Sequence, residues 1–400
     1  MSLENSRKPQ FFILLLIVSF GSVGAVLFTP ALPSIQSFFH LTIGGAQLTV
    51  TSYLIGYALG QLPYGPLANR FGRKRTLYIG ITIAIIGSLL CAFSAHFESF
   101  ILLVTARFLQ ALGACVGLKI SFTMIADVYE QTESTRMISR ILVAFAIMPS
   151  IAIAIGGWLT QLLNWQSCFY FLSIFGVFIL WLSSQLPETA KSIDHTALNL
   201  RSMLQGYRLK IKNQRLLTSA AMMGCGTSIV YIFASKAPFI GIQLVGLKPN
   251  EFGTFNLIPP LGMLLGSFLA SQLVARFHLL QVLLFGIIAS LITTLTMLIP
   301  FILIKPTLWS LFLPMILIYA SETFIYANIS SFGLSSAKDK SNASAVLNFI
   351  NMGTAVIAVL LTELILPESA LLMPLSFLFF FLIMLLFWFR IRRLSKEPHQ

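Results

Sequence analysis

The sequence predicts an all-α integral membrane protein with twelve transmembrane helices in two six-helix halves. Of its 400 residues, 57% are hydrophobic and 10% are charged, and the mean hydropathy is +0.87. A water-soluble globule has about a quarter of its residues charged, so the bulk of this chain must lie in a bilayer. Because a spanning helix takes roughly 20 apolar residues, the length leaves no room for a sizeable soluble catalytic domain.

Twelve apolar stretches of spanning length follow one another along the chain. They are 11–32, 46–68, 75–94, 99–125, 138–161, 167–186, 217–240, 252–274, 279–302, 308–331, 343–365 and 370–391. The first resembles a secretory signal peptide, but it continues past Phe28 without a clear cleavage site, so we interpret it as a retained span. The cysteines have none of the close spacings of a metal site or disulfide framework, and we expect packed thiols. They are Cys91, Cys115, Cys168 and Cys225.

The basic residues indicate the orientation of these spans. Of the 26 Lys and Arg residues, 21 fall at the N-terminus, at the C-terminal end or in alternate connections, whereas the opposite connections hold only Lys248 and Lys305. Since cytoplasmic loops carry the excess of Lys and Arg, both termini are predicted in the cytoplasm of a bacterial-type inner membrane. The net charge of +13 is therefore a topology signal, and no nucleic-acid partner is expected.

The longest connection divides the chain. We predict an N-terminal bundle over 1–186, a cytoplasmic linker over 187–215 with six basic residues, a C-terminal bundle over 216–391 and a cytoplasmic tail over 392–400. The halves carry a weak internal repeat at an offset of 206 residues: Gly56 and Gly60, followed by Arg70-Phe71, match Gly262 and Gly266, followed by Arg276-Phe277. Spaced glycines let helices approach closely in lipid, and duplicated six-helix halves are typical of secondary transporters.

Four ionisable residues lie inside predicted spans, where a charge is costly unless it faces protein or water. Glu322 is the one carboxylate near the middle of a span. It belongs to a stripe of residues that lie within about 80° of one another on a helix: Met315, Tyr319, Glu322, Tyr326 and Ser330. A carboxylate shielded from water there can bind and release a proton near neutral pH, and the alternative is a structural partner for a buried cation.

The other three are the cations Arg107, Lys119 and Lys236. Twelve residues separate Arg107 from Lys119, or 120° around a straight helix, so they share a face only if that helix bends. Lys119 is then either functional or structural, and Lys236 could reach lipid headgroups instead. If all four groups point inward, the excess charge is about +2, which favours an anionic ligand.

Other acids lie nearer the ends of spans. Glu98 and Glu363 are expected at the surface because hydration is easy there. Asp127 ends the fourth span near a basic loop and is predicted to pair with Arg73.

A motif between the second and third spans resembles the cytoplasmic signature of the major facilitator superfamily. It reads Gly65-Pro66-Leu67-Ala68-Asn69-Arg70-Phe71-Gly72-Arg73-Lys74-Arg75. The resemblance implies the major facilitator fold, a central cavity lined by helices 1, 4, 7 and 10, and a gating role for signature residues. The gating residues implied are Gly65, Asn69, Arg70, Gly72 and Arg73, with Asp127.

Further stretches resemble the bicyclomycin-resistance type (Bcr/CflA) of drug:proton antiporters. They are Pro30-Ala31-Leu32-Pro33, the run from Gly60 to Gly65, Arg107-Phe108-Leu109-Gln110-Ala111-Leu112-Gly113, Gly156-Gly157-Trp158 and Ala237-Pro238-Phe239. This resemblance implies that Arg107 takes part in proton coupling, that Gln110 faces substrate and that Gly156 and Gly157 take part in gating.

Three positions depart from that pattern. Asn69 stands where the signature has an aspartate, Val26 replaces an acid that many relatives keep in helix 1, and Ala152-Ile153 replaces a step that ends in proline. The departures leave the fold prediction intact and bear on coupling and substrate.

The sequence therefore favours a secondary active transporter that exports a small drug or metabolite by alternating access, coupled to protons. No phosphate-binding loop occurs, so no cofactor is expected and the energy must come from an ion gradient, a substrate gradient or a partner. We favour a proton gradient. Glu322 is the expected proton carrier and Arg107 its electrostatic partner. The residues expected to face substrate are Lys119, Lys236, Tyr231, Tyr319, Tyr326 and Gln110. We expect a monomer that contacts the lipid bilayer and a small-molecule substrate.

The alternative is an importer or facilitator of an anionic metabolite, such as a polycarboxylate or metal chelator. A membrane sensor that lost transport is a further class, disfavoured because the chain has no sizeable extramembrane domain to signal with. An enzyme is least favoured, because the spans contain no metal-ligand cluster or Ser/His pair.

Overall fold

The structure, a computed structural model, describes residues 9–190, 193–194, 213–335, 340–365 and 368–395, and in these ranges it contains helices and no strands. All twelve predicted stretches are helical. Among the described residues, ten helical segments are long and apolar enough to cross a membrane. The other two stretches correspond to α3 (Ile43–Gly60), followed by α4 (Tyr64–Phe71), and to α8 (Gln131–Leu162), whose apolar part is Ile147–Leu162. The predicted all-α membrane fold is confirmed.

The chain forms two compact units, the first comprising Met1–Ala31 and Ser52–Met203 and the second Leu32–Thr51 and Leu204–Gln400. Sequence alone assigns 32–51 to the N-terminal half, whereas the structure groups it with the second unit, so α3 begins in one unit and ends in the other. Most of the predicted linker, and the end of the predicted tail, lie outside the described residues. The predicted domain boundaries therefore stay predictions.

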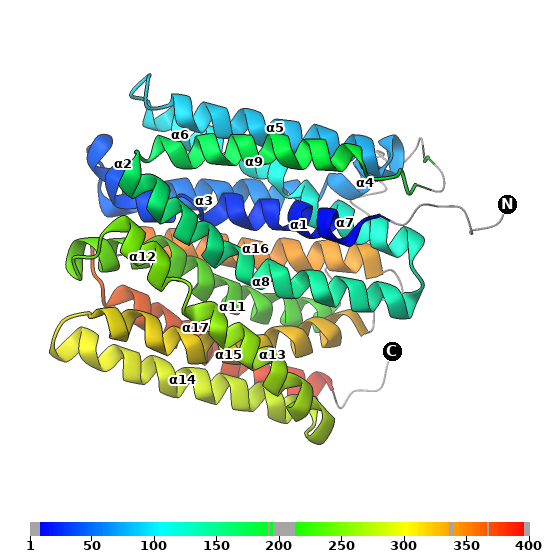
Figure 1. Ribbon diagram of the computed structural model, residues 1–400. Helices are drawn as coiled ribbons and strands as arrows, with labels where there is room; N and C mark the ends of the chain where they lie inside the picture. The colour runs from blue at the N-terminus through cyan, green and yellow to red at the C-terminus, as the bar shows by residue number, and fades with distance from the viewer. Residues whose placement is uncertain (1–8, 191–192, 195–212, 336–339, 366–367, 396–400) are drawn as a thin grey trace. The chain divides into compact units, whose positions relative to one another are not determined.

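The first unit is built around two helices that pack against several others. Besides α4, α8 and the end of α3, its helices are α1 (Phe11–Val26), α5 (Arg73–Phe93), α6 (Phe100–Ala114), α7 (Val116–Val128) and α9 (Gln166–Ser184). α5 packs against α6 and α9, and α1 packs against α7 and α8 (Figure 1). A short helical turn, Thr29–Ala31, follows α1 and packs against α8.

The fourth predicted span is broken. α6 ends at Ala114 and α7 begins at Val116, with Cys115 between them. Ser99 precedes α6 and caps it, because its side-chain oxygen accepts from the Leu102 N–H at 3.3 Å. The straight-helix geometry that separates Arg107 from Lys119 by 120° therefore does not apply across the break.

The second unit is built around α11 (Gln214–Pro238), which packs against three helices: α15 (Leu308–Ser335), α16 (Lys340–Leu364) and α17 (Leu372–Leu394). α13 (Pro259–Arg276) and α14 (Leu279–Leu303) pack on α15 (Figure 1). The remaining helices are short, α2 (Leu32–Phe38) and α12 (Pro249–Phe255). α11 ends at a proline and continues as a wider turn over Phe239–Leu244, because proline cannot donate to the helical ladder.

The predicted glycine repeat corresponds to a packing repeat. A side chain added at Gly56 or Gly60 of α3 would meet the backbone of α6, and one added at Gly262 or Gly266 of α13 would meet the backbone of α15. Each unit thus contains a helix pair whose close approach depends on two glycines one turn apart, as the sequence repeat indicates. The four cysteines are free and buried, as predicted.

Candidate functional site

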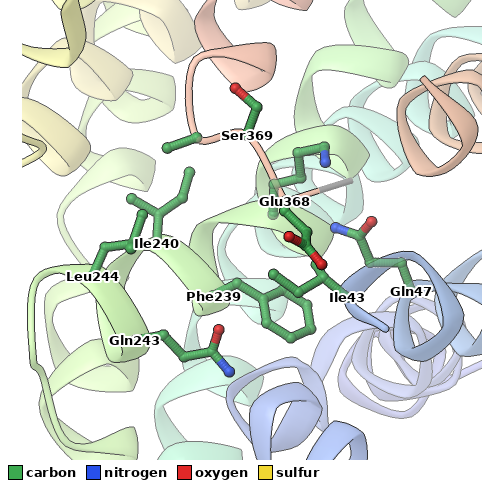
Figure 2. Close-up of a pocket in the computed structure, with 10 residues that line it drawn as sticks. Ile43, Gln47, Phe239, Ile240, Gln243, Leu244, Glu368 and Ser369 are labelled. Atoms are coloured by element: carbon green, nitrogen blue, oxygen red, sulfur yellow. The ribbon is translucent and has the colours of Figure 1, made fainter. Parts of the chain in front are cut away.

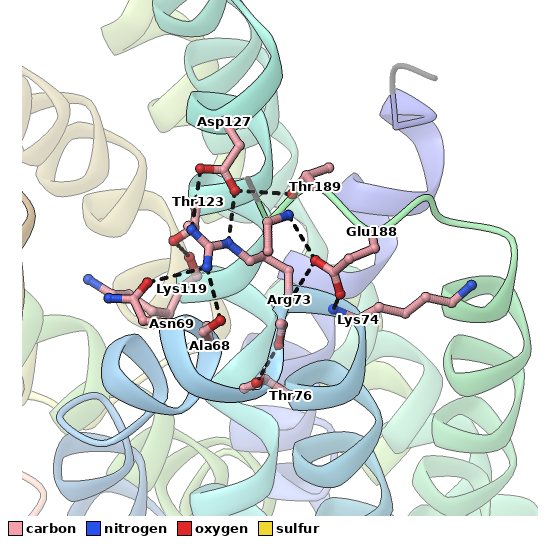
Figure 3. Close-up of polar contacts among 12 residues, drawn as sticks. Ala68, Asn69, Arg73, Lys74, Thr76, Lys119, Thr123, Asp127, Glu188 and Thr189 are labelled. Atoms are coloured by element: carbon pink, nitrogen blue, oxygen red, sulfur yellow. Dashed lines mark hydrogen bonds and ion pairs between the residues drawn. The ribbon is translucent and has the colours of Figure 1, made fainter. Parts of the chain in front are cut away.

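Arg73, the first residue of α5, joins three elements of the first unit (Figure 3). Its Nε donates to Asp127 Oδ2 at 2.8 Å and its Nη2 to Asp127 Oδ1 at 3.4 Å, which makes a two-pronged ion pair between α5 and α7. Its Nη1 donates to the Ala68 carbonyl at 2.9 Å and to Asn69 Oδ1 at 3.3 Å. The predicted Arg73–Asp127 pair is confirmed, and Asn69 supplies the arginine with a neutral acceptor.

Glu188 completes this cluster, and sequence reasoning missed it. Its Oε1 accepts from the Arg73 backbone N–H at 2.9 Å and its Oε2 from that of Lys74 at 3.0 Å. These N–H groups have no partner within the first turn of α5. Gly72, at φ +88°, leaves room for the carboxylate, since an added Cβ would lie 2.6 Å from Glu188 Oε2. An acid directly after an apolar span, next to a basic loop, was the available signal.

The Glu188 carboxylate is held in its charged form. Partial burial raises its pKa, but hydrogen bonds from the backbone N–H groups of Ala190, Arg73, Lys74 and Thr189 outweigh burial. The net effect is a pKa below the ordinary value. A carboxylate at a helix N-terminus is also favoured by the helix dipole.

The structure also shows the neighbours of two further signature residues, which the sequence did not indicate. Gly65 faces Lys119, because an added Cβ would lie 3.5 Å from Lys119 Cε. Arg70 is half-buried, and its guanidinium lies 5.7 Å from the centre of the Phe71 ring. Lys119, predicted to face substrate, therefore lies beside the signature segment.

Arg107 is fully buried in the first unit and is bound by carbonyl oxygens. Its Nη1 donates to the Gly24 carbonyl at 2.9 Å and to Gln110 Oε1 at 2.6 Å, and its Nη2 donates to the Ala25 carbonyl at 3.3 Å. Both carbonyls belong to the last turn of α1, where backbone oxygens lack helical partners. Arg107 therefore ties α6 to the C-terminal end of α1.

Aromatic rings surround the same guanidinium. It lies 4.1 Å from the Phe28 ring centre, 4.3 Å from that of Tyr53 and 5.8 Å from that of Phe169. Gln110 is engaged at both ends of its amide, because its Nε2 donates to Ser88 Oγ at 2.7 Å. A buried cation that donates to carbonyls and faces ring surfaces has its charge stabilised without direct contact with water.

Gly156 and Gly157 of α8 are both buried. A side chain at Gly156 would meet the carbonyl of Leu27, directly after α1. Gly156 therefore permits a close approach between α8 and the end of α1 that holds Arg107.

Glu322 lies on α15 in the second unit and is 6% exposed. Its Oε1 has no hydrogen-bond partner among the described residues. The backbone of α11 packs directly against the carboxylate, since a Cβ added at Gly226 would collide with Oε2. Within the described ranges no Lys or Arg forms an ion pair with it.

A hydrogen-bonded chain of polar side chains crosses three helices near Glu322. Thr227 Oγ1 of α11 donates to Asn351 Oδ1 of α16 at 2.8 Å, and Asn351 Nδ2 donates to the Tyr326 hydroxyl of α15 at 3.4 Å. The predicted stripe on α15 is not uniformly accessible: Tyr319 is 7% exposed, whereas Tyr326 is 38% exposed. Tyr231 of α11 is half-buried.

The comparisons with known proteins agree with this architecture. Residues 12–360 match the family described as Major Facilitator Superfamily. The chain belongs to the Major Facilitator Superfamily. It is therefore a transporter and not an enzyme.

Relatives and solved structures of the superfamily resemble much of the chain. It is 28% identical over 288 residues to an uncharacterized transporter of Rickettsia bellii, and the matched region covers 71% of this chain and 70% of the relative. It is 26% identical over 278 residues to a bicyclomycin resistance protein homolog of Haemophilus influenzae, and the matched region covers 68% of this chain and 69% of the relative. A crystal structure of a D-xylose-proton symporter superposes with a TM-score of 0.76 at 15% identity, over 94% and 96% of the two chains. The structural likeness indicates the shared fold.

One expectation for this superfamily member is wrong. Glu363, expected at the surface near the end of a span, is 5% exposed and accepts a hydrogen bond from Thr51 Oγ1 at 2.5 Å. Its carboxylate and the Lys236 ammonium attract one another, and Lys236 is 3% exposed. Thr51 lies more than 300 residues away, so no local pattern indicates this burial.

Glu363 changes the charge balance of the transporter. The excess of about +2 counted Glu322 as the one buried acid. With Glu363 also buried, the excess falls to about +1 when every group is ionised, so the electrostatic argument for an anionic ligand weakens. Arg107 and Lys119 lie in the first unit, and Glu322, Lys236 and Glu363 in the second.

Proposed function

We propose that the chain is a proton-coupled efflux transporter for a small drug or metabolite, in which Glu322 carries the proton. The observation that carries the proposal is the environment of Glu322: a buried carboxylate in a spanning helix, with one oxygen lacking a hydrogen-bond partner among the described residues. Intramembrane carboxylates are costly and mark proton relays in transporters. The direction of transport rests on the relative named for bicyclomycin resistance.

Burial makes the protonation of such a group depend on access to water. The neutral form of a carboxylic acid is favoured away from water and the charged form is favoured in water or beside a cation. A change that alternately exposes and shields Glu322 would therefore release and recover its proton. In this scheme alternating access itself couples the proton to the substrate.

The remaining predicted site residues receive roles within this proposal. Arg107 supplies a fixed positive charge, because its guanidinium stays protonated. Tyr326, the most exposed of the three tyrosines, is the leading substrate contact. Lys119, Lys236, Tyr231, Tyr319 and Gln110 are the other proposed substrate residues.

The gating residues act at two places in this scheme. The cluster of Arg73, Asp127 and Glu188, with signature residues Gly65, Asn69, Arg70 and Gly72, acts as a cytoplasmic gate. Gly156 and Gly157 allow α8 to move against α1.

Transport by purified protein in liposomes tests the proposal. A pH-sensitive dye inside the vesicles reports proton movement when cationic, neutral and anionic compounds are added one at a time. We expect a substrate-dependent pH change with the wild type and its loss in Glu322→Gln, which keeps the shape but cannot exchange a proton. Glu98→Gln is the matched control, since Glu98 is exposed in the turn between α5 and α6, and should behave as the wild type.

The same assay decides between this proposal and anion transport. An anionic compound that moves without a pH change in either protein would indicate a facilitator and would exclude Glu322 as the proton carrier. A pH change that persists in Glu322→Gln would assign the proton to another group.

A further inference from the structure

A second buried carboxylate lies outside the site proposed above. Glu363 of α16 accepts from Thr51 Oγ1 of α3 at 2.5 Å through its Oε1, and both residues belong to the second unit. Its Oε2 is buried and lacks a hydrogen-bond partner among the described residues. Buried polar atoms in native proteins are nearly always satisfied, so this oxygen requires an explanation.

A small cavity (Figure 2) is lined by Lys236, the residue whose ammonium attracts this carboxylate. Its volume is about 40 Å³, which suffices for a few waters at roughly 10 to 15 Å³ each. The cavity is lined by Gln47 of α3 and Lys236 of α11, among other residues. Gln47 lies one helical turn before Thr51 and is fully buried. Its Nε2 donates to the Ser235 carbonyl at 3.1 Å, whereas its Oε1 lacks a donor among the described residues.

The two unsatisfied atoms are both acceptors, so what is lacking here is hydrogen-bond donors. A proton on Glu363 Oε2 converts that oxygen into a donor, and waters in the cavity can donate to Gln47 Oε1. Among the described residues, Lys236 faces the carboxylate from α11 and the uncharged Thr51 faces it from α3, while Glu368 lines the cavity from the segment before α17.

We propose that Glu363 is a second proton-binding carboxylate, with Lys236 as its counter-charge and the cavity beside Gln47 as the path by which the proton reaches water. Protonation adds one H⁺ to Oε2 and removes the negative charge that Glu363 presents to the Lys236 ammonium; release of that H⁺ restores this charge. The place of this step in transport rests on the proton-coupled function proposed above, whereas proton binding at Glu363 does not depend on it.

Proton counting on the purified protein tests the assignment. The pH of a weakly buffered solution is lowered from 9 to 5.5, and proton uptake per molecule is measured with an indicator dye. We expect Glu363→Gln to take up one proton fewer than the wild type. Glu98→Gln is the control and should match the wild type, because Glu98 is exposed and does not line the cavity. Equal uptake by Glu363→Gln and the wild type would overturn the proposal.

A second pair of variants separates the loss of a proton site from an effect of misfolding. Glu363→Gln leaves a buried ammonium facing a neutral group, whereas the double variant Lys236→Met with Glu363→Gln removes both charges, and removing both is less damaging than breaking a buried pair. The double variant should recover thermal stability lost in Glu363→Gln and should take up one proton fewer than Lys236→Met alone. Equal proton uptake by the double variant and by Lys236→Met would also refute the assignment.

The outcome is separable from that of the proposed function. Glu322→Gln tests the coupling of transport, and proton counting on Glu363 variants needs no substrate. A persistent pH change in Glu322→Gln together with one lost proton in Glu363→Gln would reject the first proposal and support the second.

Discussion

Three carboxylates in this protein are held in different ways, and the difference lies in their partners. Glu188 accepts backbone N–H groups at the start of α5, which favour its charged form. Glu363 accepts a hydrogen bond from Thr51 through one oxygen, and the Lys236 ammonium attracts its carboxylate. Glu322 has neither arrangement among the described residues. The same chemical group can therefore serve as a permanent helix cap or as an exchangeable proton site.

Glu188 yields a prediction with a defined sign. Because its pKa is lowered in the folded protein, its stabilising effect is complete above its ordinary pKa of 4.5 and is lost as the pH falls below that value. We expect Glu188→Gln to lower the melting temperature of the detergent-solubilised protein equally at pH 7 and pH 5.5. The difference from the wild type should shrink below pH 4.5. A difference that stays constant into that acidic range would show that the charge of Glu188 contributes nothing.

Sequence reasoning finds a residue when the signal is local and misses it when a distant partner creates the environment. Glu322 stands out as the lone acid in the middle of an apolar stretch, and the Arg73–Asp127 pair follows from a basic loop near an acid at a helix end. Glu363 lies near the end of its span, where water is the ordinary neighbour. Its burial depends on Thr51, and a contact over that distance is set by the tertiary fold.

At the scale of helices, the sequence predicts each helical stretch but not its interruptions. The stretch 99–125 reads as continuous, yet the helix breaks at Cys115. A side chain at Gly113 would meet the backbone of α5, and one at Gly117 would meet the backbone of α1. The residues around the break are thus small because two other helices approach them, and these tertiary contacts are not readable from hydropathy.

The glycine pairs give a prediction at the same scale. We expect Gly56→Ala and Gly262→Ala to destabilise the protein by about 1 to 3 kcal/mol each, because the added methyl would meet the carbonyl oxygens of Phe108 and Ile316. Gly353→Ala in α16 is the control, since no atom lies within 4 Å of its added Cβ. Melting temperatures measured by fluorescence in detergent compare the three. Equal melting of all three variants would contradict the packing role of the repeat.

For the whole molecule, the glycine repeat connects sequence and architecture. Each unit contains a helix pair brought into close contact by two glycines, although the repeat in the sequence is weak. Packing rather than the hydrophobic effect drives helix association in lipid, so a duplicated fold retains the glycines at these contacts while other positions diverge. This explains why the repeat is weak in sequence and clear in structure.

Orientation in the membrane is predicted from charge alone, and labelling can test it. Lys248, Lys305 and Arg276 are exposed, and the native cysteines are buried, so cysteines introduced at these three positions can be labelled over a low background. We expect a membrane-impermeant maleimide to label Lys248→Cys and Lys305→Cys in intact cells, and Arg276→Cys only after permeabilisation. The physical reason is that Lys and Arg are retained on the cytoplasmic side during insertion.

The opposite labelling pattern would change the interpretation of both proposed proton sites. Glu363 lies near the end of its span, beside a connection predicted on the outer side, and Glu188 lies on the side predicted to be cytoplasmic. An inverted protein would place the cavity beside Gln47 on the cytoplasmic side, and Glu363 would then exchange its proton with the cytoplasm. The labelling result therefore fixes from which side of the membrane the proton at Glu363 is drawn.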